Sequence, residues 1–145
     1  MVQKTRGFTV FELMVALAIV AILVVIAIPT YNGLMPRYRL NGAARQVMGD
    51  LINARMNAVK LNTTMSITFT GSGYTISNAS SGGSYNVTFN IQDHYSGVTI
   101  NPVPSGFAFI SRGATEDSGS HTVTLINSAG SREVAVNVAG QIRIN

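Results

Sequence analysis

The chain has 145 residues, no cysteine, and a formal net charge of +4 at pH 7. This length suits one modest domain plus an anchor, and the lack of cysteine excludes disulfide cross-links and cysteine-based metal sites. Residues 61–145 carry three arginines against four acids, a net charge of −1, so the basic excess lies further upstream and is weak evidence for nucleic-acid binding.

The first predicted element is a membrane-length apolar helix behind a short basic leader. Lys4 and Arg6 belong to the leader, and an unbroken apolar run extends from Leu13 to Ile28. Residues 8–28 span about 31 Å as a helix, which matches the hydrocarbon core of a bilayer. A secretory signal peptide fits less well, because its apolar part is typically ~7–15 residues long and ends at a small-residue cleavage site.

One acidic residue, Glu12, lies near the start of this apolar segment. A carboxylate in hydrocarbon is costly, so a lone one indicates a functional site and requires a positively charged partner. An ordinary single-span anchor explains neither this acid nor the Gly7-Phe8 pair before it. We expect the partner to be a new α-amino group, made by cleavage between Gly7 and Phe8.

This arrangement resembles the N-terminus of type IV prepilins and type II secretion pseudopilins. The resemblance implies that a prepilin peptidase removes residues 1–7 and methylates the new terminal amine of Phe8. It also implies that residues 8–28 first hold the subunit in membrane lipid and later pack against other pilins in a filament. There, Glu12 would meet the methylated Phe8 amine of a neighbouring subunit.

The resemblance also decides the expected orientation in the membrane. Lys4 and Arg6 favour a cytoplasmic N-terminus, but Arg37 and Arg39 lie close to the other end of the span and oppose that bias. In family terms the chain crosses the bacterial inner membrane once, with a cytoplasmic N-terminus and a periplasmic C-terminal domain. It then enters a pilus or pseudopilus.

Residues 29–60 are predicted to form a stem. Pro29, Gly33 and Pro36 disfavour helical structure, so we expect the helix to kink or melt locally near Pro29. This break is either a joint used in the filament or simply the end of the anchor.

The stem is predicted to end in an amphipathic helix. Its apolar stripe comprises Leu40, Ala44, Val47, Met48, Leu51, Ile52, Ala58 and Val59, and its polar stripe comprises Gln46, Asp50, Asn53, Asn57 and Lys60. Arg55 falls at the edge of the apolar stripe, where its stem would follow the helix while its guanidinium reaches water.

Residues 61–145 are predicted to form an antiparallel β domain that packs on the stem, which gives an α+β, pilin-like fold. Short alternating runs separated by turn residues occur at 65–69, 74–77, 85–91, 98–100, 107–111, 122–127, 133–138 and 141–144. Residues 127–130 read as a hairpin loop, and residues 80–84 as another loop.

The downstream sequence resembles the GspH/FimT type of minor subunit, in residues 54–60, 109–113, 123–125, 134–137 and 140–144. This resemblance implies a structural subunit that helps initiate or cap a type IV pilus or a type II secretion pseudopilus. The alternatives are a major pilin subunit and a minor pilin that binds DNA for uptake.

The DNA alternative depends on three arginines, Arg112, Arg132 and Arg143. Some FimT-type subunits that capture DNA resemble one another in a basic Gly-Arg-x-Arg stretch, which here reads Gly140-Gln141-Ile142-Arg143, with one arginine replaced. DNA binding uses several cations to neutralise phosphates, so the net charge of −1 over residues 61–145 favours three solvated arginines instead.

The sequence predicts no enzyme, cofactor or metal site. His94 and His121 are the only histidines, and both are expected to be exposed beside turns. No nucleophile elbow, phosphate-binding glycine loop or metal-ligand spacing accompanies them.

Overall fold

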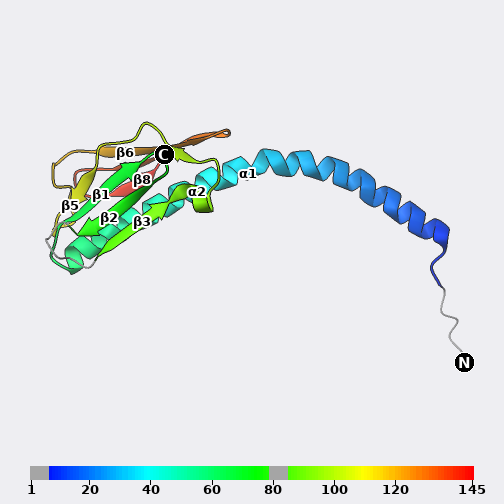
Figure 1. The fold of residues 1–145 in the computed structure, drawn as a ribbon, viewed down its shortest axis with the longest axis horizontal. Helices are drawn as coiled ribbons and strands as arrows, with labels where there is room; N and C mark the ends of the chain where they lie inside the picture. Colours follow the sequence, from blue (N-terminus) through cyan, green and yellow to red (C-terminus); the bar gives the residue numbers. More distant parts are fainter. Residues whose placement is uncertain (1–6, 79–84) are drawn as a thin grey trace, which may run out of the picture. The chain divides into compact units, whose positions relative to one another are not determined.

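The computed structural model describes residues 7–78 and 85–145, without the side chains of Pro29, Thr30 and Asn32. Lys4, Arg6 and the loop expected at residues 80–84 lie outside the described residues. Contacts divide the chain into two units, Met1–Met35 and Pro36–Asn145. The first unit holds the N-terminal part of one long helix, and the second holds the rest of that helix and every described strand (Figure 1).

The long helix, α1, runs from Val10 to Lys60 and ends in a Schellman motif. Asn62 has a φ of 50°, and the N–H groups of Asn62 and Thr63 donate to the carbonyl oxygens of Val59 and Ala58. These two bonds satisfy carbonyls that a helix end leaves unpaired, and asparagine tolerates the left-handed backbone that the motif needs. The chain therefore turns out of α1 into the first strand within a few residues.

Pro29, Gly33 and Pro36 all lie inside α1, which is helical throughout this stretch. The local melting expected near Pro29 is therefore absent from this structure, whereas the kink stays a prediction. The boundary between the two units falls directly before Pro36. No heavy atom lies within 4 Å of a Cβ placed on Gly33, so neighbouring side chains do not explain a glycine there.

The second unit contains two four-stranded antiparallel sheets, and all eight expected strands are present among the described residues (Figure 1). The first sheet has the order β3-β2-β1-β5 and the second the order β4-β6-β7-β8. The strands are β1 (Met65–Thr70), β2 (Gly73–Asn78), β3 (Asn86–Asn90), β4 (Thr99–Ile100), β5 (Phe107–Phe109), β6 (His121–Asn127), β7 (Gly130–Val136) and β8 (Ile142–Ile144).

The local connections are mostly those that the turn residues predict. The β6–β7 hairpin pairs Asn127 with Gly130 around a two-residue loop, as expected. A short helix, α2 (Ile91–His94), was not expected, because Ile91 was assigned to the preceding strand. Asn90 ends β3 instead: its side-chain oxygen accepts the Gln92 N–H at 3.1 Å and caps the helical turn.

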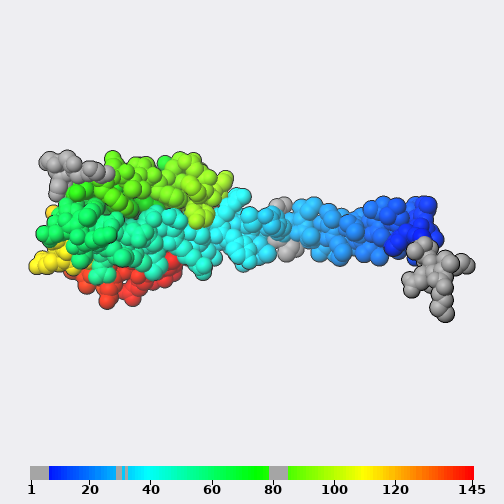
Figure 2. Space-filling model, turned by 90° about the horizontal axis from the view of Figure 1, so that it is seen from below, coloured from blue at the N-terminus to red at the C-terminus, as the bar shows by residue number. Residues whose placement is uncertain are grey.

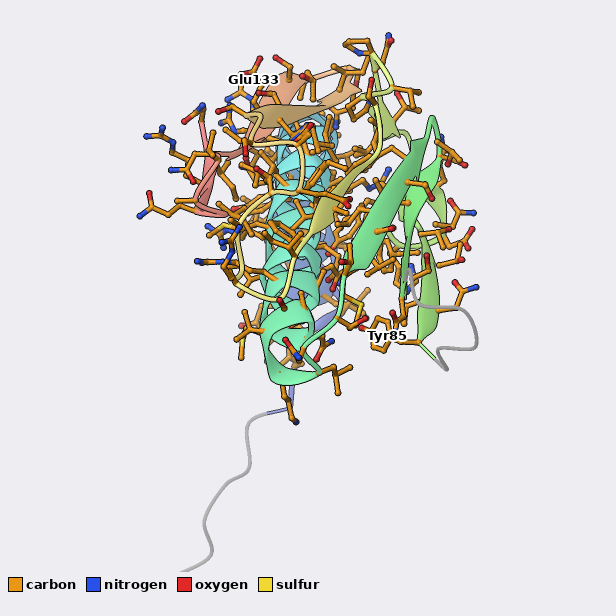
Figure 3. All side chains as sticks on the ribbon, turned by 90° about the vertical axis from the view of Figure 1, so that its left-hand side faces the viewer. Tyr85 and Glu133 are labelled. Atoms are coloured by element: carbon orange, nitrogen blue, oxygen red, sulfur yellow. The ribbon has the colours of Figure 1, made fainter. Side chains whose placement is uncertain are left out.

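One hydrophobic core joins α1 to both sheets (Figure 3). The buried α1 side chains are Leu40, Ala43, Ala44, Val47, Leu51, Ala54 and Ala58, and alternate residues of both sheets face them. The predicted stripe is wrong at two positions, because Ile52 is 36% exposed and Val59 is 51% exposed. Ala43 and Ala54 are fully buried, so small residues of α1 form part of the face that packs on the sheets.

A polar contact fixes α1 against the first sheet. The Tyr74 hydroxyl donates to the Asp50 carboxylate, which also accepts from Gln46 Nε2 at 3.0 Å. Burial raises the pKa of the Tyr74 phenol, and the hydrogen bond and negative charge of Asp50 raise it further. Gln46 and Asp50 are therefore part-buried and do not belong to an outward polar stripe.

Tyr74→Phe is expected to destabilise the chain by about 1.5–3 kcal/mol, because it removes a hydrogen bond to a charged group. The measurement is urea unfolding of the full chain in detergent, followed by circular dichroism. Thr88→Val is the matched control, since its hydroxyl contacts Thr75 on the exposed face. A loss no larger than that of the control would contradict an anchoring role for Asp50.

Candidate functional site

The acid in the apolar segment, Glu12, lies in the first turn of α1 and closes it. Glu12 Oε2 accepts the Thr9 N–H at 3.0 Å, and the Glu12 N–H donates to Thr9 Oγ1 at 3.2 Å. Thr9 Oγ1 also donates to Glu12 Oε2 at 3.0 Å. This reciprocal pattern is a capping box, which the Thr-x-x-Glu spacing of residues 9–12 signals in the sequence. Sequence reasoning missed it, because the acid was interpreted only as a partner for a cation.

The expected cleavage junction, Gly7-Phe8, precedes the first helical residue, Val10. Gly7 is exposed and Phe8 is 83% exposed. No heavy atom lies within 4 Å of a Cβ placed on Gly7, so packing within the chain does not require a glycine at this position. Both residues of the expected junction are therefore exposed in the described part of the chain.

The apolar segment is exposed to the surroundings of the chain along its described length. Val10–Ile28 has a mean hydropathy of 3.0 and is the one stretch of the described residues that is long and apolar enough to cross a membrane. Every described residue from Phe8 to Ile28 is exposed (Figure 2). Soluble domains rarely leave so continuous an apolar surface in water, so lipid or other apolar helices must cover this one.

Arg55 joins α1 to two loops, which the sequence did not indicate. Its Nε donates to the Gly113 carbonyl at 2.8 Å, and its Nη2 donates to the Ala139 carbonyl at 3.2 Å. The expectation that this guanidinium simply reaches water is therefore wrong. Gly113 and Gly140 have φ angles of 78° and 73°, in the left-handed region that favours glycine.

The three arginines proposed for DNA binding do not share one face. Arg132 lies on β7 in the same alternation as the buried Val134, and it donates to Asn41 Oδ1 at 2.9 Å. Arg143 pairs with Ala135, so it projects from the opposite side of the second sheet. Arg112 is exposed in the turn that follows β5.

The two histidines differ in their surroundings. His94 is exposed and stacks on Phe89, as expected for a residue near a turn. His121 is in β6, where it stacks on Phe107 with centroids 4.3 Å apart, and its side chain is only 13% exposed. Its Nε2 lies 3.0 Å from Asp117 Oδ1. The Gly119 N–H and the His121 ring lower the pKa of Asp117.

No catalytic arrangement surrounds either histidine in the described part of the chain. No serine hydroxyl there is hydrogen-bonded to a histidine, and no cluster of three histidine, aspartate or glutamate residues could hold a metal ion. His121 was expected to be exposed and is not, because the alternation of β6 continues inward from Leu125 and Val123 to residue 121.

Comparison with known proteins identifies the family. A model described as type II transport protein GspH matches residues 43–141, and a model of the prokaryotic N-terminal methylation motif matches residues 2–28. The chain belongs to the GspH family. None of the curated proteins compared matches the sequence significantly.

The fold is similar to that of the type IV minor pilin FimU of Pseudomonas aeruginosa PAO1, which is 20% identical. The match to one crystal form has a TM-score of 0.61 and covers 75% of this chain and 90% of the FimU chain in that structure. A second, also 20% identical, gives 0.57, with 73% and 92% covered. These likenesses confirm the pilin-like α+β fold.

The two matching family models carry further conclusions. The methylation motif implies processing by a prepilin peptidase and assembly with other pilins. Together with the exposed apolar helix, it indicates a membrane-anchored pilin. The family is one of structural, pilin-type subunits.

Proposed function

We propose that this GspH-family protein is a minor subunit that helps initiate or cap a type IV pilus or a type II secretion pseudopilus. The observation that carries the proposal is an exposed membrane-length helix with one acid in its first turn, joined to a packed β domain. A helix of this kind leaves lipid at low cost only if it enters an equally apolar bundle. The β domain would then lie outside that bundle.

The proposed assembly step pairs opposite charges on neighbouring subunits. Cleavage after Gly7 frees the amine of Phe8, which is methylated and remains positively charged. In the filament this amine meets Glu12 of an adjoining subunit. A buried carboxylate without a cation is strongly penalised, so the pair sets axial register more than it adds net stability. Before assembly, the chain crosses the inner membrane once, with its N-terminus in the cytoplasm and residues 61–145 in the periplasm.

Intact-mass analysis of the native protein tests the processing step. We expect a chain that begins at Phe8 and carries one extra methyl group, and Gly7→Val is expected to retain residues 1–7. Because open space surrounds Gly7, this variant should leave the β domain folded. Gly33→Ala is the matched control, since its Cβ also meets open space. Native protein that retains residues 1–7, or normal cleavage of Gly7→Val, would contradict the proposal.

A deletion strain tests the role in assembly. Loss of a subunit that starts or caps filaments should sharply reduce their number, while the filaments that remain keep their normal main subunit. Unchanged filament number and secretion would exclude this role. If the deletion strain made no filaments because their most abundant subunit was missing, the protein would instead be a major subunit.

A further inference from the structure

The outer strand of the first sheet, β3, has one edge without a neighbouring strand. β3 stands at the end of the order β3-β2-β1-β5 (Figure 1). Asn86, Val87, Thr88 and Asn90 are exposed. An edge strand presents a row of unpaired N–H and C=O groups, which is a template for pairing with another chain. Neither the apolar helix nor the proposed charge pair involves this edge, so its exposure needs a separate explanation.

The hydrogen bonds to β2 show which backbone groups of β3 face outward. The Tyr85 carbonyl accepts an N–H of β2 at 3.0 Å, and the Ile91 N–H donates to the turn before β2 at 2.8 Å. Bonded residues recur at every second position of an antiparallel ladder, so the odd-numbered residues of this strand face β2. The N–H and C=O groups of Asn86 and Thr88 therefore point away from β2. These groups have no hydrogen-bond partner among the described residues.

An apolar side chain beside this edge is also incompletely covered. Val87 lies opposite Ile76, which is 3% exposed, so both side chains face the core, yet Val87 is 46% exposed. Phe89, two residues along on the same face, packs against the core. A further strand beside β3 would place a side chain next to Val87, because directly opposite residues share one face of a sheet. The edge therefore offers backbone hydrogen bonds and apolar contact together.

The other sheet edges in the described part of the chain are shorter, charged or covered. The Glu116 N–H donates to the Ala108 carbonyl at 2.9 Å, so the outer side of β5 is already paired. β4 has two residues, and β8 has three, of which Arg143 is charged. β3 has five residues without a charge or a proline. Short length, charge and coverage usually protect an edge strand, and the described residues give β3 none of these protections.

We propose that the β3 edge binds an extended, uncharged segment of another protein, which joins the first sheet as an additional antiparallel strand. The backbone of that segment would form hydrogen bonds with Asn86 and Thr88, and an apolar residue would lie opposite Val87. In strand addition the backbone bonds provide affinity and the alternate side chains provide specificity. A charged residue opposite Val87 would meet no oppositely charged group on β3, so the segment is expected to be uncharged there.

A second copy of the chain fits this edge less well. Two copies that paired through β3 would be related by a two-fold axis perpendicular to the sheet. Helix α1 buries residues from Leu40 to Ala58 in the core that it shares with this sheet, so its axis runs along the sheet face. The two-fold axis would make the two copies of this helix segment antiparallel, with their Pro36 ends facing opposite directions. Two subunits anchored in one membrane must instead run in the same direction.

Peptide binding to the full chain in detergent tests the inference. The probe is a fluorescent peptide in which valines alternate with threonines between terminal lysines that keep it soluble. When a valine lies opposite Val87, the threonine N–H groups face Asn86 and Thr88, and the valine N–H groups face outward. Methylation of the valine nitrogens should therefore leave binding intact, whereas methylation of the threonine nitrogens should abolish it. Fluorescence anisotropy compares these two peptides, which have identical side chains.

Two protein variants place the peptide on β3. Val87→Lys is expected to weaken binding of the valine-methylated peptide roughly tenfold, because a lysine on an edge strand opposes pairing. Val103→Lys is the matched control, since Val103 is 50% exposed and lies outside the described strands, and it should bind the peptide as the parent does. Circular dichroism of both variants checks that the β domain stays folded.

Equal binding of the two methylated peptides would overturn the proposal, and so would the lack of saturable binding up to millimolar concentration. A Val103→Lys effect as large as that of Val87→Lys would also overturn it. If the chain alone sedimented as a dimer that Val87→Lys dissociated, the partner would be a second copy and not another protein. The peptide assay requires neither lipid nor filaments, so failure of the proposed assembly role would leave its result unchanged.

Discussion

Glu12→Gln is expected to leave the helix cap intact and still exclude the subunit from filaments. The glutamine oxygen can accept from Thr9, as the carboxylate does at 3.0 Å, but it carries no charge for the Phe8 amine of a neighbour. Breaking a buried charge pair costs about 3–5 kcal/mol, which corresponds to a loss of incorporation of roughly 100- to 5,000-fold. Immunoblotting of sheared filaments against total membrane protein measures it.

Two companion variants separate the charge from the cap. Thr9→Ala removes the capping hydroxyl and keeps the acid, so it should cost about 1 kcal/mol of helix stability and assemble nearly normally. Glu12→Ala removes both functions, and it should fail like Glu12→Gln while residues 61–145 stay folded. If Glu12→Gln assembled normally while Thr9→Ala and Glu12→Ala failed, Glu12 would serve only as a cap.

Gly140→Ala is expected to destabilise the β domain by about 3–5 kcal/mol. A Cβ at this position would lie 2.0 Å from the Gly113 carbonyl oxygen and 2.9 Å from Arg55 Nε. The left-handed backbone costs an alanine about 1–2 kcal/mol, and displacing the Gly113 carbonyl removes a charged hydrogen bond worth about 1.5–3 kcal/mol. Urea unfolding of the full chain in detergent, followed by β-sheet circular dichroism, measures the loss.

Gly97→Ala provides the control for Gly140→Ala. Gly97 also has a positive φ, 83°, but no heavy atom lies within 4 Å of its Cβ position, so only the backbone term of about 1–2 kcal/mol should appear. Placing Gly140→Ala in an Arg55→Met background should reduce its effect, because the hydrogen bond is already absent. Strictly additive losses would show that Arg55 and Gly140 act independently.

Elements with strong local periodicity were predictable from sequence. The apolar run to Ile28 and the alternation in each short strand depend on neighbouring residues alone, so the anchor, the eight strands and the α+β class followed from pattern. The Asn127–Gly130 hairpin followed from turn chemistry. The proposed processing and register residues Gly7, Phe8 and Glu12 came from a motif rather than from packing.

Features that depend on distant contacts were not predictable. Arg55 meets carbonyls 58 and 84 residues further along the chain, and no local pattern signals such a contact. Ile52 and Val59 fit the apolar period, but the two sheets cover only part of the helix circumference. Two features did carry local signals. The Thr-x-x-Glu spacing of residues 9–12 signals the capping box, but Glu12 was interpreted only as a partner for a cation. The alternation of β6 signals the inward position of His121, but His121 was assigned to the neighbouring turn.

The segment of α1 from Leu40 to Ala58 supplies the helical side of the β domain's core, and it belongs to the same helix that begins at Val10. A pulling force on the N-terminal end of the subunit would therefore reach the β domain through the α1 side chains that are buried between Leu40 and Ala58. Helix α1 would resist such a force through its packing in the one hydrophobic core that it shares with both sheets. The packing of this alanine-rich helix face against the sheets, rather than the pairing between strands, would then determine how much tension the subunit withstands.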